Sequence, residues 1–446
     1  MSHRLFGTDG VRGRAGEYPL DHETTARLGA ALVRAMRTEG RQLRFIAGRD
    51  TRESGEWIER ELARGVRAEG AHITSGGVLP TPAVAYVTRE MAYDAGLVIS
   101  ASHNPFQDNG IKVFSGRGEK FTERVEREVE AIVADRSWQA RRGEAVPLPT
   151  AALVAPYLAH LRAVLEHPAA LDGVRIAIDC AHGATSTVAP ELFRSIGLEP
   201  IVIGDHPDGR NINLRSGSTH PERLAQVVVE KKCALGVAFD GDGDRAIFVD
   251  ESGKTVDGDA VLLMCARQLQ REGRLKGGAI VATVMSNLGL QVALAESGIG
   301  LVRCPVGDKY VMEEMLARGL SLGGEQSGHI IFSDYLFTGD GLCTALNVLR
   351  TVALSGRSLA DLANDLVTYP QILLNVRVRE KVELKTVPAI ASAIARVEQR
   401  LDGQGRLVVR YSGTEPLLRV MLEGRNETEV RTWAQEIIDV VKQELG

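Results

Sequence analysis

The stretch LRFIAGRDTRESGEWIERELARGVRAEG (43–70) shows the pattern that most of this chain repeats. A short apolar run leads through a polar turn into an amphipathic helical pattern, which is typical of a βαβ unit in a mainly parallel sheet. The same order returns in VRIAIDCAHGATS (174–186) and AIVATVMSNLG (279–289). The three matches predict three similar α/β domains with mixed, mainly parallel sheets.

The pattern changes after Pro370. The runs QILLNVRV, RLVVRY and LLRVMLEG read as strands, VPAIASAIARVEQR reads as a helix, and a terminal helix starts near Glu427. This order predicts a small C-terminal α+β domain with an antiparallel sheet. Composition breaks in RSWQARRGEAVPLPT (136–150) and near 251–257 and 369–370 then divide the chain. We expect domains at 1–150, 151–254, 255–368 and 369–446.

Composition excludes several classes of protein. The 446 residues are 44% hydrophobic and 25% charged, which excludes wholesale disorder. The net charge of −5 gives no chain-wide positive field, so we expect no nucleic-acid partner. Five cysteines without a CxxC pair indicate reduced, buried thiols. The first residues, MSHRLFGTDG, contain no apolar stretch of signal-peptide length, and 18 consecutive apolar residues occur nowhere, so we expect a cytoplasmic protein without a membrane partner.

A first chemical candidate lies in AGLVISASHNPFQDNGIKVF (95–114). An apolar strand delivers Ser102 and His103 to a turn closed by Pro105. A serine where a strand meets a loop is suited to act as a nucleophile or phosphate carrier. An ordinary Asx or Ser turn is the other interpretation. No G-x-S-x-G elbow surrounds Ser102, so a hydrolase triad is not favoured.

The second candidate is the acidic loop of ALGVAFDGDGDRAIFVD (234–250). Asp240, Asp242 and Asp244 alternate with glycine after an apolar strand, so a curled loop brings three mutually repelling carboxylates together. A divalent cation resolves that repulsion, and all-oxygen ligation favours Mg²⁺. A solvated acidic turn is the alternative. An EF-hand is excluded, because Arg245 stands where glycine is needed and β-patterned runs flank the loop.

The third candidate is SLGGEQSGHIIF (321–332). Glu325, Ser327 and His329 alternate before an apolar strand, which predicts that they share one strand face. Such a group of acceptors and hydroxyls suits a polyhydroxylated ligand. A half-exposed strand with a polar face is the other interpretation.

The fourth candidate is VVRYSGTEPLLRVMLEG (408–424). A guanidinium group, two hydroxyls and a flexible glycine together suit an anion cradle that binds phosphate. These residues are Arg410, Ser412, Gly413 and Thr414, and Arg419 adds a second set of donors. An ordinary β-turn is the alternative. One candidate in each predicted domain predicts a cleft shared by all four.

Five segments of the chain together carry a resemblance to a known family. They are FGTDGVRG (6–13), SASHNP (100–105), DGDGDR (240–245), GEQSGH (324–329) and RYSGTEP (410–416). The chain resembles the α-D-phosphohexomutases in these motifs and in their order. The resemblance implies a heart-shaped fold of three α/β domains and a C-terminal α+β domain around a central cleft.

The resemblance also implies roles for residues of this sequence. Ser102 would carry a phosphoryl group, and the three aspartates would hold Mg²⁺ with a phosphoserine oxygen. The residues expected around the transferring group are Arg12, Lys112 and Arg245, with Lys112 and His329 both open as general base and His103 orienting the loop. The expected substrate contacts are Glu325, Ser327, Arg410, Ser412, Gly413, Thr414, Arg419, Gly307 and Asp308.

Two positions depart from the family pattern. In VGDKYV (306–311) Lys309 stands where arginine is expected, and Tyr411 stands where many relatives carry proline. Lysine is a point charge and arginine a planar fork, so the contact made by Lys309 is in question.

The reaction implied by the resemblance interconverts glucosamine 6-phosphate and glucosamine 1-phosphate. It uses a phosphoserine enzyme, has glucosamine 1,6-bisphosphate as intermediate and activator, and supplies UDP-N-acetylglucosamine synthesis. A homodimer is compatible with this assignment. Three alternatives stay open: the same chemistry on glucose or mannose phosphate, a haloacid-dehalogenase-like phosphatase with Asp240 as nucleophile, and a non-catalytic phosphosugar-binding regulator.

Overall fold

The computed structural model describes residues 4–7, 9–38, 40–140, 146–165, 171–402, 405–412 and 416–446. The chain forms two compact units. The first contains Met1–Thr283 and Val302–Asn364, and the second contains Val284–Leu301 and Asp365–Gly446. The described residues form four sheets.

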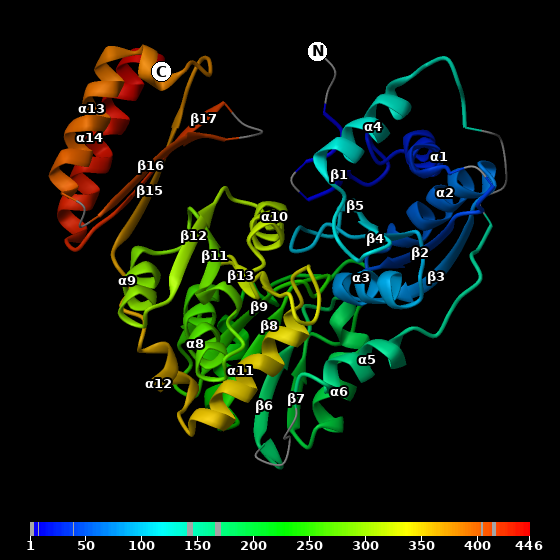
Figure 1. Ribbon diagram of the computed structural model, residues 1–446, viewed down its shortest axis with the longest axis horizontal. Coiled ribbons are helices and arrows are strands. Elements are labelled where there is room, and N and C mark those ends of the chain that lie inside the picture. The colour runs from blue at the N-terminus through cyan, green and yellow to red at the C-terminus, as the bar shows by residue number, and fades with distance from the viewer. Residues whose placement is uncertain are drawn as a thin grey trace. The chain divides into compact units, whose positions relative to one another are not determined.

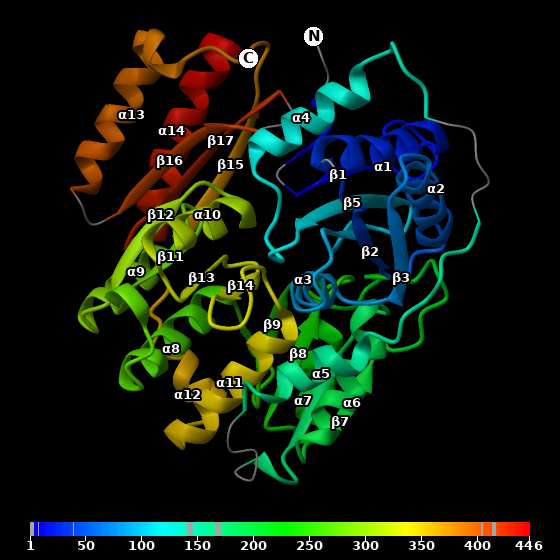
Figure 2. The ribbon, with the colours of Figure 1, turned by 45° about the vertical axis from the view of Figure 1, so that its right-hand side comes forward.

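The first sheet has the strand order β1-β5-β4-β2-β3. Its strands are β1 (Val11–Arg14), β2 (Arg44–Arg49), β3 (His72–Val78), β4 (Ala95–Ile99) and β5 (Asp108–Ser115). Strand β2 runs parallel to β3 and β4, whereas β5 is antiparallel to β4 and β1. Helices α1 (His22–Met36) and α2 (Gly55–Ala68) lie on the face opposite α3 (Thr81–Glu90), and α4 (Glu123–Ala134) packs on α1 (Figures 1 and 2).

The second sheet has the order β10-β9-β8-β6-β7. Its strands are β6 (Arg175–Asp179), β7 (Glu199–Ile203), β8 (Leu235–Phe239), β9 (Ala246–Asp250) and β10 (Thr255–Val256). Its helical elements are α5 (Val154–Arg162), η2 (Ala184–Thr187), α6 (Ala189–Ser195) and α7 (Glu222–Glu230). Strand β10 carries this sheet to Val256, two residues beyond the boundary expected at 254, and the three boundaries between the four domains stay predictions.

The third sheet has the order β12-β11-β13-β14. Its strands are β11 (Ala279–Thr283), β12 (Gly300–Cys304), β13 (Leu322–Gly324) and β14 (Ile330–Phe332). The helical elements of this part of the chain are α8 (Gly258–Arg271), η3 (Lys276–Gly278), α9 (Leu288–Glu296), α10 (Asp308–Arg318), α11 (Gly341–Ser355) and α12 (Leu359–Ala363).

These three sheets repeat one arrangement. In each, an antiparallel pair (β4 and β5, β8 and β9, β13 and β14) has its first strand parallel to the next strand of the sheet. The prediction of similar α/β domains with mixed sheets is confirmed. The Ser102 loop, the acidic loop and the 325–329 segment therefore occupy the same connection in three related sheets. All residues of β4 and β8 are buried, which fixes the base of the first two loops.

The fourth sheet lies in the second unit and has the order β15-β17-β16. Its strands β15 (Gln371–Arg377), β16 (Arg406–Tyr411) and β17 (Leu417–Glu423) pair antiparallel, as expected for an α+β domain. Helices α13 (Pro388–Leu401) and α14 (Glu427–Leu445) pack together beside this sheet (Figure 1), and η4 (Leu384–Thr386) precedes α13. Helix α14 begins at the predicted residue because the Asn426 side chain caps its first turn.

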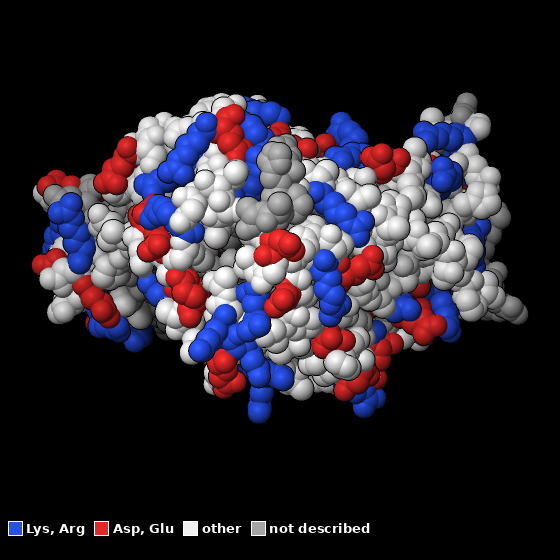
Figure 3. All heavy atoms as spheres, turned by 90° about the horizontal axis from the view of Figure 1, so that it is seen from below, with Lys and Arg blue, Asp and Glu red and all other residues white. Residues whose placement is uncertain are grey.

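The surface carries charges of both signs. On the face seen in Figure 3, lysine and arginine side chains lie among aspartates and glutamates, so the coloured part of that face presents no extended area of one sign. Among the described residues, no helix combines the length and the apolar character needed to span a bilayer.

Candidate active site

Ser102 is presented by the loop that follows β4. It has a left-handed backbone (φ 53°) and its side chain is completely buried. Its hydroxyl donates to Asp240 Oδ2 at 2.5 Å, and its backbone N–H donates to Ser100 Oγ at 2.9 Å. Positive φ at a residue other than glycine costs energy and is concentrated at functional sites. The geometry therefore fits a serine held for chemistry rather than an ordinary turn.

The acidic loop brings its three carboxylates together, as the sequence predicts. One oxygen from each of Asp240, Asp242 and Asp244 lies within 4.8 Å of the others, and all three residues are buried. Burial, then Asp244 and Asp242, raise the pKa of Asp240 well above its usual range. Asp242 Oδ1 and Asp244 Oδ1 accept no hydrogen bond from any described residue. Buried carboxylate oxygens that converge in this way fit a metal ion.

Lys112, from β5, supports the same triplet from the first sheet. Its ammonium lies 2.8 Å from Asp242 Oδ2 and from Asp244 Oδ2, and 3.2 Å from Asp9. Burial opposes its charge, but Asp242, Asp244 and Asp9 outweigh burial and raise the pKa of Lys112 well above its usual value. The ammonium group of Lys112 therefore donates hydrogen bonds to two carboxylates of the triplet. Whether Lys112 or His329 serves as general base stays a prediction.

Two arginines lie around the serine loop. Arg12 pairs with Asp9 and donates to the carbonyl of Ala101 at 3.3 Å, while Arg245 lies 3.2 Å from His103 Nδ1. Burial, then Arg245 and Arg12, lower the pKa of His103 to about 4. The neutral imidazole accepts a hydrogen bond from Arg245 and so orients it. Both guanidinium groups remain partly open to solvent, with 26% of Arg12 and 20% of Arg245 exposed.

The 325–329 segment corrects the expectation of a shared strand face. The segment is a turn between β13 and β14, in which the N–H of Gly328 donates to the carbonyl of Glu325 at 3.0 Å. Glu325 is half-buried, Ser327 is exposed and His329 is buried, so the three side chains do not alternate on one face. Strands of three residues are too short for the predicted alternation, and Gly328, with φ 89°, supports the turn.

His329 links the turn to the acidic loop. Its Nδ1 lies 3.6 Å from Asp244 Oδ1 and its Nε2 lies 3.6 Å from Asp308. Burial opposes a charge on the ring, but Asp244, then Asp308 and Glu325, raise the pKa of His329. Glu325 in turn accepts from the N–H of Gly307 at 3.1 Å.

Three residues that were not predicted from the sequence complete this network: Asp9, Lys120 and Glu126. Lys120 bonds both Asp9 and Asp308, and Lys309 forms a 2.6 Å ion pair with Glu126 on α4. Asp9 stands inside the quoted motif FGTDGVRG, which was a usable signal. Further partners support the serine and acidic loops directly: Asp50, Arg52, Thr81 and Asn213.

The phosphate-cradle candidates lie in the second unit. Arg410 on β16 pairs directly with Arg419 on β17, and burial followed by Arg419 lowers the pKa of Arg410. Two guanidinium groups in opposite positions on neighbouring strands suit the binding of an anion. Lys381 adds a third cation and donates to the carbonyl of Ser412 at 2.6 Å. The remaining candidates, Gly413 and Thr414, lie outside the described residues.

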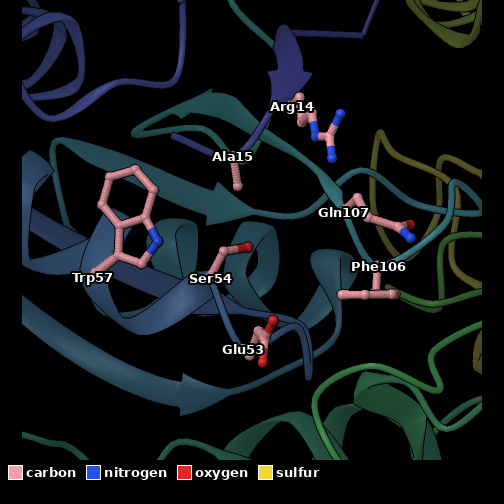
Figure 4. Close-up of a pocket in the computed structure, with 7 residues that line it drawn as sticks. All are labelled: Arg14, Ala15, Glu53, Ser54, Trp57, Phe106 and Gln107. Atoms are coloured by element: carbon pink, nitrogen blue, oxygen red, sulfur yellow. The ribbon is translucent and has the colours of Figure 1, made fainter. Parts of the chain in front are cut away.

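A cavity of about 430 Å³ on the first sheet's side of the serine loop contains none of the predicted site residues. Figure 4 shows its lining side chains, which are Arg14, Ala15, Glu53, Ser54, Trp57, Phe106 and Gln107. The candidate site is therefore defined by the three converging, buried carboxylates and not by this cavity.

Four domain families match the chain in order, and they confirm the class. Phosphoglucomutase/phosphomannomutase alpha/beta/alpha domains I, II and III match residues 3–140, 155–253 and 257–369, and the C-terminal domain matches 373–440. A solved phosphoglucomutase/phosphomannomutase family protein from Burkholderia thailandensis shares this fold, with a TM-score of 0.81 and 23% identity over 99% of this chain and 98% of that one. The protein is thus a phosphohexomutase, an isomerase.

Curated relatives narrow the class. The phosphoglucosamine mutase of Solibacter usitatus is 48% identical over 100% of both chains, and that of Geobacter metallireducens is 44% identical over 99% of both. The chain belongs to the phosphoglucosamine mutase family.

Proposed function

We propose that this phosphohexomutase interconverts glucosamine 6-phosphate and glucosamine 1-phosphate through a phosphoserine at Ser102. The observation that carries the proposal is the 2.5 Å contact between the Ser102 hydroxyl and Asp240, one of three converging carboxylates. The phosphoserine transfers its phosphoryl group to the 1-hydroxyl of glucosamine 6-phosphate, which forms glucosamine 1,6-bisphosphate. The bisphosphate then reorients within the site. Ser102 takes the phosphoryl group from the 6-position, which leaves glucosamine 1-phosphate.

The metal of this proposal is Mg²⁺, held by Asp240, Asp242 and Asp244. The convergence of the three buried carboxylates and the free hydrogen-bonding capacity of Asp242 Oδ1 support this role, because Mg²⁺ prefers oxygen ligands together with substrate phosphate. When bound, the ion neutralises charge on the transferring phosphoryl group.

The surrounding cationic side chains balance the net negative charge of the site. A phosphoserine carries about −1.5 to −2 at neutral pH, so together with three carboxylates and one divalent ion the site stays near −3. The anionic phosphate of the substrate and the developing charge on the attacking oxygen therefore require added positive charge. Lys112, Arg12 and Arg245 supply that charge, and the loose, in-line transition state of phosphoryl transfer gains from it.

The remaining candidate residues bind the sugar and its non-reacting phosphate. Glu325, Ser327, Gly307 and Asp308 contact the sugar, and the anion cradle of Arg410, Ser412, Gly413, Thr414 and Arg419 binds the phosphate that is not reacting. The opposed pair of Arg410 and Arg419 supports an anion there. Because the bisphosphate reorients between the two transfers, the same cradle binds the non-reacting phosphate of both monophosphates.

The cellular setting is part of the proposal. All five cysteines are free and buried, which suits the reducing cytoplasm. The product supplies UDP-N-acetylglucosamine synthesis, and a homodimer is compatible with the fold.

The decisive experiment compares the wild type with Ser102→Ala. Intact mass before and after phosphatase treatment should show one phosphoryl group on the wild type alone, mapped to Ser102, and turnover should fall by orders of magnitude in the variant. Parallel assays with the 6-phosphates of glucosamine, glucose and mannose should give the highest kcat/KM for glucosamine. Near-normal turnover by Ser102→Ala would refute the mechanism, and a preference for glucose or mannose would refute the substrate.

A further inference from the structure

The backbone carbonyl of Ser102 accepts hydrogen bonds from two side chains that come from different sheets. Arg52, in the turn after β2, donates to it at 3.0 Å, and Asn213, in the connection between β7 and α7, donates at 2.9 Å. The same two side chains also donate to the carbonyl of Asn104, at 2.8 Å and 3.1 Å. The serine loop is therefore held by its backbone on both sides of His103.

Arg52 is itself held rigidly. Its side chain is completely buried, and its Nε donates to Asp50 Oδ2 at 2.8 Å. The same carboxylate oxygen accepts from Ser100 Oγ at 2.6 Å, and Ser100 Oγ accepts the N–H of Ser102. Asp50, Arg52 and Ser100 thus fix both the N–H and the carbonyl of Ser102. A buried charge pair with all its hydrogen bonds satisfied resists displacement.

Asn213 brings the serine loop and the acidic loop together. It is buried, has a left-handed backbone (φ 59°), and donates its own N–H to the carbonyl of Ala181 at 2.8 Å. A Cβ at Gly241 would lie 2.6 Å from the Ser102 carbonyl oxygen and 2.9 Å from Asn213 Nδ2. The acidic loop therefore packs directly on this hydrogen bond, which only glycine at 241 permits.

We propose that Arg52 and Asn213 are positioning residues that hold Ser102 in its left-handed conformation, with Oγ aimed at the acidic triplet. Neither side chain touches the Ser102 hydroxyl or a metal-ligating oxygen, so both act through the backbone of the nucleophile. The inference rests on the proposed role of Ser102 as phosphoryl carrier. Small errors in the placement of reacting groups cost up to about a hundredfold in rate, so loss of one support should lower kcat rather than raise KM.

The test replaces Asn213, because Arg52 is deeply buried and its loss would endanger folding. Asn213→Gly keeps the left-handed backbone and removes the donor, and Asn213→Asp places an acceptor against two carbonyls. The matched control is Arg210→Gln, which breaks the exposed 2.7 Å contact of Arg210 with Glu53 between the same two segments. Each protein is assayed for kcat, KM, Tm and the rate at which a hexose 1,6-bisphosphate phosphorylates Ser102, followed by intact mass.

We expect kcat and the phosphorylation rate of Asn213→Gly to fall about tenfold, with KM and Tm matching the control, and a larger fall for Asn213→Asp. If Asn213→Asp does not fold, Asn213→Gly decides alone. Variants that phosphorylate Ser102 as fast as Arg210→Gln would overturn the inference. The inference would also fail if the rate fell only in proportion to lost folded protein. Failure of the proposed function is distinct, since it would appear as turnover by Ser102→Ala.

Discussion

Ser102 and Asp240 are 138 positions apart in the chain, yet the serine hydroxyl donates a 2.5 Å hydrogen bond to the carboxylate. Only the unmodified serine can make this bond, because a phosphate ester oxygen carries no proton there. Phosphorylation therefore replaces an attractive contact by repulsion between a phosphate and three carboxylates. A divalent cation between them removes that repulsion.

The first prediction follows from this exchange. Phosphorylated protein should bind Mg²⁺ at least about tenfold more tightly than protein treated with phosphatase, since each kcal/mol of relieved repulsion appears in the binding free energy. Titration calorimetry on the two forms measures the difference. Asp242→Ala should bind the ion in neither form. Equal dissociation constants for the two forms would contradict the shared role of Ser102 and the aspartates.

A second prediction concerns pH and the buried Asp340, which caps α11 and accepts from Tyr157 at 2.9 Å. Burial raises the pKa of Asp340 to about 6, from an ordinary 3.8. Between these values the folded protein binds more protons than the unfolded chain, so the contribution of Asp340 to stability falls as pH rises from about 4 to about 6. Asp340→Asn cannot ionise and should gain about 2 kcal/mol relative to the wild type between about pH 4.5 and 7.5.

Thermal unfolding across that range measures this effect. Tyr157→Phe is the informative companion variant, because it removes a hydrogen bond that favours the ionised carboxylate and should move the transition to higher pH. Parallel stability curves for the wild type and Asp340→Asn would contradict the assignment.

The elements that the sequence predicts correctly are those specified locally. An apolar strand followed by alternating aspartate and glycine fixes both the position and the convergence of Asp240, Asp242 and Asp244. The terminal helix likewise begins at Glu427, next to its capping Asn426. In both cases the decisive residues are neighbours in the chain.

The features that sequence reasoning misses depend on distant partners. Arg52 and Asn213 meet at the Ser102 carbonyl from 50 and 111 positions away, and no local pattern marks either residue as its donor. The 325–329 segment differs from the predicted strand for another reason. Alternating polar residues favour a strand, but β13 already ends at Gly324, and Gly328 with its positive φ lies in the turn that follows, so that glycine was the available signal.

A third prediction tests the phosphate cradle through Arg410. Charge-assisted hydrogen bonds contribute roughly 1.5–3 kcal/mol, so Arg410→Gln should raise KM about tenfold to a hundredfold for both glucosamine 6-phosphate and glucosamine 1-phosphate. Arg400→Gln, which breaks an exposed 2.6 Å ion pair with Glu436 in the same unit, is the control and should leave both KM values unchanged. An effect on only one monophosphate would show that the cradle is not shared.

The last prediction concerns Lys309, the departure from the family's arginine, and its buried partner Glu126. The two side chains are only 8% and 9% exposed and lie 2.6 Å apart. Lys309→Met leaves a buried carboxylate without its cation and should cost about 3 kcal/mol of the free energy of unfolding. The double variant Glu126→Gln/Lys309→Met should recover much of that loss, because a buried pair replaced by neutral groups no longer bears the desolvation cost of ions. Lys309→Arg keeps the charge and should stay close to the wild type. Denaturant unfolding of the wild type, the single variants Glu126→Gln and Lys309→Met, and the double variant gives the coupling energy directly, and a coupling energy of zero would show that the pair contributes nothing to holding α4 beside the 306–311 loop.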